Sequence, residues 1–184
     1  VNGIPANVGV AIAGSSGGSF TLNADGTYTF NAGRDFDRLA VGEKALTSVP
    51  YHVTDSEGGT ATATLTTEVT GANDGPVSTP LGNLSNEDAN VVTIDLSSHF
   101  SDVDNGDTLT YSVSGLPAGL TIDAATGVIS GTIDRSASQD GQNGVYLITI
   151  TATDSQGAST SQTFDWTITN PIPVAADDHN VAIQ

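Results

Sequence analysis

The chain alternates apolar and polar residues over short runs, as strands with one buried face do. These runs are rich in Thr, Val, Ile, Tyr and Phe, and clusters of Gly, Asn, Asp and Ser separate them. Many short strands spaced about 8 to 12 residues apart favour β-sandwiches over parallel sheets, and no convincing helical period is present. The clearest predicted strands cover residues 19–23, 27–30, 61–69, 109–113, 145–152 and 163–169.

Two local features sharpen this picture. Residues 24–26 read Ala-Asp-Gly between the first two runs and predict a hairpin turn that contains Gly. Trp166 alternates with Phe164 and Ile168, which predicts a core residue of the last strand. A Trp166 that faced outward would instead be able to stack on a sugar.

An internal repeat sets the number of modules. The motif at 53–58, Val-Thr-Asp-Ser-Glu-Gly, recurs at 152–157 as Ala-Thr-Asp-Ser-Gln-Gly, an offset of 99 residues. A period of this length predicts two similar units. We expect a module at 1–74, whose segment before Ser19 is weakly patterned, a module at 75–170, and a linker with the start of a further module at 171–184.

The amino-acid composition limits which binding partners the protein can have. The 21 Asp and Glu against 4 Lys and Arg give a net charge of -17, which repels nucleic acid and anionic lipid head groups. The excess charge needs an offset, and divalent cations held by oxygen ligands would supply it. The chain has no Cys, which excludes disulfides and thiolate metal sites.

The sequence also shows no signal for a membrane anchor or for export. We find no run of about 18 apolar residues and no basic region followed by an apolar one at the N-terminus, so we expect neither a membrane span nor a classical signal peptide. The chain reads as an internal fragment of a longer protein, or as an exported module addressed by another segment.

The densest candidate for chemistry is an acidic segment in which Asp102, Asp104 and Asp107 fall within six residues. An Asp-x-Asp pair in extended backbone turns both carboxylates to one face, and calcium requires about six to eight oxygen ligands. The segment is not an EF-hand, because Gly106 comes one residue early and Val113 occupies the twelfth position. A solvated acidic turn is the alternative.

Enzymatic readings are weaker. Gly14, Ser16 and Gly18 fit the Gly-x-Ser-x-Gly pattern but lack the strand-turn-helix context of a nucleophile elbow. The carboxylates cluster at expected module ends, and aromatic residues make up only 5% of the chain, so a glycosidase pair is not favoured. We expect a protein that is not an enzyme.

Two groups of short motifs stand out along the chain. One group lies at 86–88, 102–104, 126–129, 133–135 and 152–154, and the other at 18–30, 39–43, 53–55 and 70–76. With the first group, residues 86–173 resemble a cadherin-like module of the dystroglycan or putative Ig type. With the second, residues 17–76 resemble the VCBS repeat of large RTX-type bacterial adhesins. Both imply tandem Ig/cadherin-like Greek-key β-sandwiches.

The cadherin resemblance implies calcium at the junctions between modules. It nominates Asn73, Asp74, Asp102, Asp104 and Asp154 for one junction, with Asp107 either joining them or only capping the turn. A second junction, toward a following module, would draw on Glu87, Asp88, Asp134, Asp177 and Asp178. Ser136 stands where the family has Glu, so this second site departs from the family pattern.

The implied function is a structural extender of a bacterial surface adhesin, rigidified by calcium and supporting cell adhesion or biofilm formation. The resemblance further implies type I secretion to the cell surface or the medium, a monomer that contacts neighbouring modules of its own chain, and host-cell or surface ligands bound through other modules. Two alternatives stay open: a module that binds a glycan or peptide, and an accessory domain of a hydrolase.

Overall fold

The computed structural model of the chain describes residues 8–173, and these residues form β-strands joined by turns and two short 3-10 helices. The predicted all-β class of Ig/cadherin-like sandwiches is confirmed. Contacts divide the chain into two compact units. Unit 1 contains the residues up to Pro76 together with the loops Asp102–Thr108 and Asp154–Ala158, and unit 2 contains Val77–Ser101, Leu109–Thr153 and the residues from Ser159 onward.

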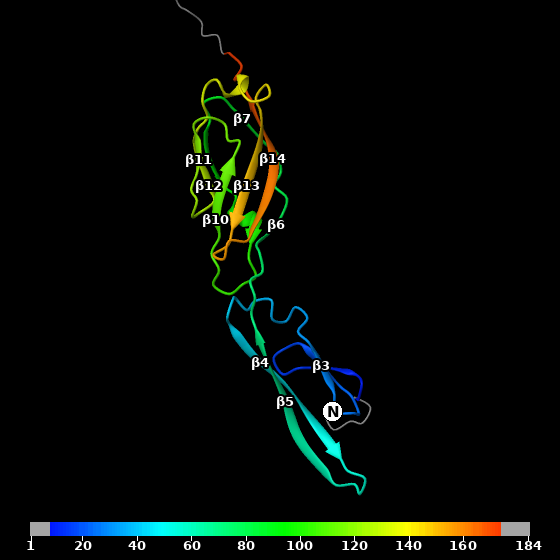
Figure 1. Cartoon of the computed structure of the whole chain (residues 1–184). Helices are drawn as coiled ribbons and strands as arrows, with labels where there is room; N and C mark the ends of the chain where they lie inside the picture. The colour runs from blue at the N-terminus through cyan, green and yellow to red at the C-terminus, as the bar shows by residue number, and fades with distance from the viewer. Residues whose placement is uncertain (1–7, 174–184) are drawn as a thin grey trace, which may run out of the picture. The chain divides into compact units, whose positions relative to one another are not determined.

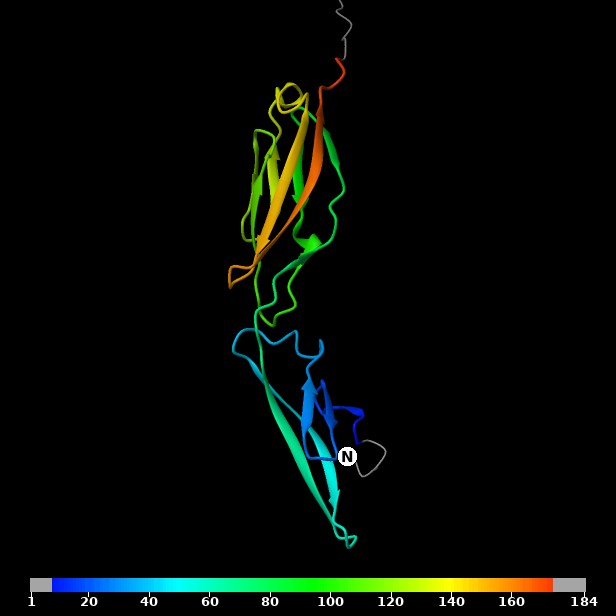
Figure 2. The same ribbon diagram turned by 45° about the vertical axis from the view of Figure 1, so that its right-hand side comes forward.

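Unit 2 is built from two facing sheets, whose layers can be followed in Figures 1 and 2. One sheet has the order β10-β13-β14-β7 and the other β11-β12-β8, while β6 and β9 form a small third pair. Strand β7 pairs with β14 in parallel, and the other pairs in unit 2 are antiparallel. The strands are β6 (Val77–Ser78), β7 (Leu84–Glu87), β8 (Val91–Asp95), β9 (Phe100–Ser101), β10 (Thr110–Ser114), β11 (Leu120–Ile122), β12 (Val128–Thr132), β13 (Val145–Thr153) and β14 (Ser159–Thr169), and the 3-10 helices are η2 (Ser97–His99) and η3 (Ala137–Gln139).

The core of unit 2 follows from side-chain alternation in its longest hairpin. Strands β13 and β14 pair over nine residues, with Ile148 opposite Phe164. Since neighbouring side chains point to opposite faces, one face carries the buried residues Phe164, Trp166 and Ile168. Trp166 is fully buried and its Nε1 donates to Asn86 Oδ1 at 3.0 Å. The prediction that Trp166 is a core residue is confirmed, and the outward-facing alternative is wrong.

Unit 1 contains a smaller pair of sheets. Strands β1 (Ala11–Ala13), β2 (Ser19–Leu22) and β3 (Tyr28–Asn31) form one sheet, and β4 (Lys44–Thr54) and β5 (Thr60–Thr70) form a hairpin. Phe20 and Val49 are buried between them. The rings of Phe20 and Phe30 lie with their centroids 4.8 Å apart. The core of this unit is thus aromatic and small.

The predicted turn at 24–26 is present. Asn23 N donates to Thr27 O at 2.8 Å, and Gly26 has φ of 83°, a conformation that Gly adopts without steric cost. The six predicted strands agree with β2, β3, β5, β10, β13 and β14 to within a few residues at their ends. The sequence did not predict β4, which has Pro50 at its centre, a residue that counts against a strand.

The hairpin of unit 2 offers a direct test of this core. Replacing the fully buried Ile148 by Ala should lower the free energy of unfolding by about 2 to 5 kcal/mol, because the change removes apolar contacts and leaves a cavity. Replacing its neighbour Leu147, which is 65% exposed, by Ala should change that free energy by less than about 0.5 kcal/mol. Urea unfolding followed by Trp166 fluorescence measures both. Equal effects of the two variants would contradict the assigned strand faces.

Candidate metal centre

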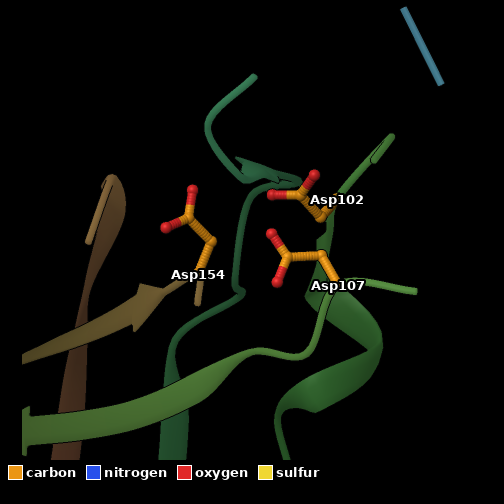
Figure 3. Close-up of side chains that lie close together, drawn as sticks. All are labelled: Asp102, Asp107 and Asp154. Atoms are coloured by element: carbon orange, nitrogen blue, oxygen red, sulfur yellow. The ribbon is translucent and has the colours of Figure 1, made fainter. Parts of the chain in front are cut away.

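Three segments of unit 1 come together around acidic side chains. The loop Asp102–Thr108 connects β9 to β10, the loop Asp154–Ala158 closes the β13–β14 hairpin, and residues 73–76 lead from β5 to β6. Asp102, Asp107 and Asp154 each place one carboxylate oxygen within 4.8 Å of those of the other two. Figure 3 shows the three carboxylates turned toward a common space. We call Asp102, Asp104, Asp107 and Asp154 the acidic cluster.

Backbone amides hold these carboxylates in place. Asp102 Oδ1 accepts from Asp104 N at 2.9 Å, and Asp107 Oδ1 accepts from Thr108 N at 2.9 Å and from Ser155 N at 3.2 Å. The last of these bonds ties the two loops of the cluster together. Each carboxylate therefore has a fixed direction before any ligand arrives.

The turn that carries Asp154 has the same hydrogen bonds as the turn that carries Asp55, its counterpart in the internal repeat. Asp154 Oδ1 accepts from the amides of Gln156 and Ala158, at 2.9 and 2.8 Å. Asp55 Oδ1 accepts from the amides of Glu57 and Gly59 in the same way, at 2.9 and 2.7 Å. The repeated Thr-Asp-Ser-x-Gly motif is thus a carboxylate-capped hairpin turn, which uses one oxygen and leaves the second free for another partner.

The segment after β5 supplies those partners. Asn73 Nδ2 donates to Asp154 Oδ2 at 2.8 Å, and the backbone N of Asp74 donates to Asp104 Oδ2 at 3.0 Å. The side chain of Asp74 is exposed. The structure therefore brings together five of the six residues predicted for the first site through their side chains, and Asp74 through its backbone.

Two carboxylate oxygens of the cluster are buried without a hydrogen bond. These are Asp102 Oδ2 and Asp104 Oδ1. A buried polar atom, above all a charged one, is costly unless it is paired. The single ion pair among residues 8–173 joins Lys44 to Glu68, so no basic side chain compensates the cluster within that range. An oxygen-only donor set of this kind suits a hard cation such as calcium.

Hydrogen bonding lowers the pKa of two carboxyl groups of the cluster. Hydrogen bonds from Ser155 lower the pKa of Asp107, although the neighbouring charge of Asp154 acts in the opposite direction. The Asn73 amide and three backbone amides lower the pKa of Asp154. Both groups carry negative charge at neutral pH, which repels their neighbours and favours a cation between them.

One contact of the cluster loop carried no signal in the sequence. Asn105 N donates to Arg38 O at 2.9 Å, and Asn105 Nδ2 donates to Glu43 Oε2 at 3.2 Å. Glu43 Oε2 also accepts from Ala40 N at 3.1 Å. A polar loop residue 62 positions away in the chain cannot be paired with Glu43 from spacing alone. This contact attaches the loop of residues 38–43 to the edge of the acidic cluster.

The residues predicted for a second site are arranged differently. Asp88 is buried, and both its oxygens accept from Ser138, at 2.8 Å from the backbone N and 2.6 Å from Oγ. Asp134 is exposed and accepts from Ser136 N and Oγ, and Glu87 is exposed. Among residues 8–173, the acidic cluster is the one place where three carboxylates meet. Asp177 and Asp178 lie outside the described residues.

Comparison with known proteins agrees with this fold. The model of the "Putative Ig domain" family matches residues 75–169, so the chain belongs to that family. The "Bacterial Ig domain" model matches residues 3–68. The resemblance of residues 86–173 to the first family is thereby confirmed, and residues 3–68 are similar to bacterial Ig domains.

Curated relatives are adhesins. The chain is 33% identical over 130 residues to "Serine-rich adhesin for platelets" of Staphylococcus aureus strain MRSA252, and equally so to that of strain MSSA476. The match covers 70% of this chain but 9% and 5% of those relatives. The chain therefore spans less than a tenth of the length of either protein.

Solved structures support the cadherin-like fold. The extracellular cadherin domains 1-4 of protocadherin Gamma B7 give a TM-score of 0.51 at 18% identity, covering 83% of this chain and 38% of that one. The extracellular domain of protocadherin GammaB4 gives 0.50 at 16% identity, covering 86% and 27%. At these identities the likeness shows the fold alone.

The lowered pKa of Asp154 gives a pH prediction. Titration followed by NMR in the presence of chelator should place the midpoint of Asp154 below the ordinary value of 3.8. A pKa that is lower in the folded state contributes stability that is complete above the unfolded value and is lost as pH falls through the folded value. This contribution should therefore be complete above about pH 4 and should decline as the pH falls further, through the lower pKa of the folded state.

Asn73→Ala isolates the cause, because it removes the largest contribution to that lowered pKa. The midpoint of Asp154 should rise in this variant, whereas that of Asp134, which Ser136 lowers, should stay where it is. An Asp154 midpoint that does not move would show that Asn73 does not donate to this carboxylate in solution.

Proposed function

We propose that this chain is a non-enzymatic, structural segment of a bacterial surface adhesin, and that calcium bound at the acidic cluster stiffens it. The observation that carries the proposal is the pair of buried carboxylate oxygens, Asp102 Oδ2 and Asp104 Oδ1, that no hydrogen bond satisfies. They lie among acidic neighbours in a chain with a net charge of -17. A calcium ion would compensate them directly.

The chain's own residues would act as follows. Asp102, Asp104, Asp107 and Asp154 would supply carboxylate oxygens, while the amides of Asp104, Thr108, Ser155, Gln156 and Ala158 keep those carboxylates aimed. Asn73 and Asp74 would join through side-chain or backbone oxygens. Calcium would supply positive charge and would accept these oxygens as ligands. Holding three chain segments to one ion would restrict their relative motion.

We also propose that the chain comprises two modules and the start of a third. We assign residues 1–74 to a VCBS-like module of RTX type, 75–170 to a cadherin-like module, and 171–184 to a linker and the start of another module. The site would then form where the segment 73–76 enters the second module, since β9, β10, β13 and β14 all adjoin its loops. Residues 73–76 would be the hinge that the ion stiffens.

The wider role rests on the adhesin relatives and on the Ig-like modules. We propose a location at the bacterial cell surface or outside the cell after type I secretion, and a role in cell adhesion or biofilm formation as one monomeric part of a long chain. Neighbouring modules would be its direct partners. Within the described part of the chain, none of the helices has the length and apolarity to cross a membrane.

The residues predicted for the second junction are less suited to calcium than the acidic cluster. Ser138 already occupies both oxygens of Asp88, and this pairing stabilises the loop that follows β12 without an ion. Among the described residues, Glu87, Asp88 and Asp134 do not form a group of carboxylates that meet. We therefore place calcium at the acidic cluster first.

Calcium binding can be tested by stability. Sites of this kind have dissociation constants of about 10⁻⁴ to 10⁻³ M, and free calcium at ten times such a constant adds about 1.4 kcal/mol per site. Thermal unfolding should therefore shift upward when calcium replaces chelator, and calorimetric titration should show binding.

Substitutions locate that effect. Asp102→Asn and Asp104→Asn should abolish most of the calcium-dependent shift, because each removes a ligand charge. Asp165→Asn removes an equal charge from an exposed position on β14 and should retain the shift. If the two cluster variants respond to calcium like the parent chain, the ion does not bind at these residues.

Stiffening requires its own measurement. Small-angle X-ray scattering of the full chain should give a narrower distribution of particle dimensions in calcium than in chelator, and Asp104→Asn should give the broad distribution in both. Scattering that does not change on calcium removal, in a chain that calorimetry shows to bind calcium, would reject the extender mechanism while leaving the site intact.

A further inference from the structure

The outer edges of β3 and β5 in unit 1 are unpaired among residues 8–173. Strand β3 pairs with β2, and β5 pairs with β4. The repeat of 99 residues makes β13–β14 the counterpart of β4–β5, and β14 carries β7 on its outer edge. Strand β12, which follows β11 as β3 follows β2, likewise carries β8. The two units differ at one other strand, since β1 pairs with β2 whereas its counterpart β10 pairs with β13. Strands β7 and β8 have no counterpart among the described residues of unit 1.

The pairing in unit 2 fixes the positions of these strands. β7 runs parallel to β14 along Trp166–Thr169, whose counterparts in β5 are the residues Thr67–Thr70. β8 runs antiparallel to β12 along its whole length, and β3 occupies the corresponding place in unit 1. An unpaired edge presents free N–H and C=O groups that a further strand can satisfy.

Burial along the two hairpins differs accordingly. Phe164, Trp166 and Ile168 of β14 are 4%, 0% and 2% exposed. Their counterparts in β5, which are Leu65, Thr67 and Val69, are only partly buried. The core of unit 2 contains 14 buried residues, whereas that of unit 1 contains two. Unit 1 therefore has a longer hairpin, paired over eleven residues against nine in unit 2, but far fewer buried residues pack against it.

A cavity lies where that cover is missing. It has a volume of about 660 Å³, and its apolar lining includes Val8, Leu22, Tyr28, Tyr51, Val53 and Leu65. The counterparts of Tyr51 and Val53 in unit 2 are Ile150 and Ala152, which are fully buried. In unit 2, the segment that contains β7 and β8 contributes Val92, Leu96 and Phe100 to the core.

We propose that unit 1 binds a two-stranded segment of the β7–β8 kind, supplied by the same polypeptide on the N-terminal side of Val1. Its first strand runs parallel to β5 at Thr67–Thr70, its second runs antiparallel to β3, and its apolar side chains fill the cavity. The order of strands in unit 2 gives the source: β7 and β8 precede β10, and the offset of the repeat places their counterparts ahead of Val1.

This segment would bring unit 1 to seven strands in two sheets, with β1 beside β2 where unit 2 has β10 beside β13, and its binding would not depend on calcium. Seven to nine strands are usual for Ig-like sandwiches, and unit 1 has five among the described residues. The exposed Tyr28 and Val53, at 51% and 55%, would become core residues. Apolar side chains of the same polypeptide would then fill the cavity.

The test uses the chain's own strands as the probe. A copy of residues 77–101 is joined directly ahead of Val1 in the full chain. Hydrogen exchange followed by mass spectrometry should show amide protection at Tyr28–Asn31 and Thr67–Thr70 rising on the order of tenfold or more, since only opening of the added strands then exposes these amides. Exchange in β13 and β14 should stay unchanged and serves as the internal reference.

A matched control carries Leu84→Ser, Val92→Ser and Leu96→Ser within the added copy only, and it should give no added protection because its side chains cannot fill the cavity. Equal exchange with and without the intact copy would overturn the proposal. So would two other outcomes in the unmodified chain: protection of these strands that is lost on deletion of residues 1–7, or protection that rises with protein concentration together with a dimer in light scattering.

Discussion

Register in the long antiparallel hairpins is the constraint on which the rest of this protein depends. Nine consecutive pairs between β13 and β14 place Phe164, Trp166 and Ile168 on one face, and a slip by one residue would turn all of them outward. The same pairing closes the hairpin at Asp154, whose Oδ1 accepts two backbone amides. The register that builds the core therefore also delivers the carboxylate of the candidate site.

The acidic cluster combines local and long-range order. Locally, each carboxylate caps its own turn, a common use of Asp in hairpins and loops. Over longer range, Asn73, Ser155 and Asp74 bring those capped turns together. What remains is two buried oxygens without partners and a surplus of negative charge. Burying an unpaired charge costs free energy, and that cost is the physical link between this geometry and the proposed calcium dependence.

The two units show how one repeated hairpin can have different surroundings. Strand β14 lies inside a four-stranded sheet, while β5 has β4 as its one partner among the described residues. The turn motif is shared, and the capped turns at Asp55 and Asp154 are alike. The strands differ in sequence, with Thr67 at the position that corresponds to the fully buried Trp166. They also differ in the strands that pair with the hairpin, so burial reflects both the side chains of the hairpin and its neighbours in the sandwich.

Sequence patterns alone predicted the all-β class, the repeated Thr-Asp-Ser-x-Gly motif, the core position of Trp166 and the acidic loop, because alternation and turn chemistry act between residues close in the chain. The resemblance to cadherin-like modules predicted that Asn73 and Asp154 lie beside that loop. The folded structure was needed to show that Asp107 lies beside Asp102 and Asp154, that Ser138 donates to both oxygens of Asp88, and that Asn105 contacts Glu43. These contacts join residues 5 to 62 positions apart, and most of them depend on how separate loops are brought together, which local patterns do not encode.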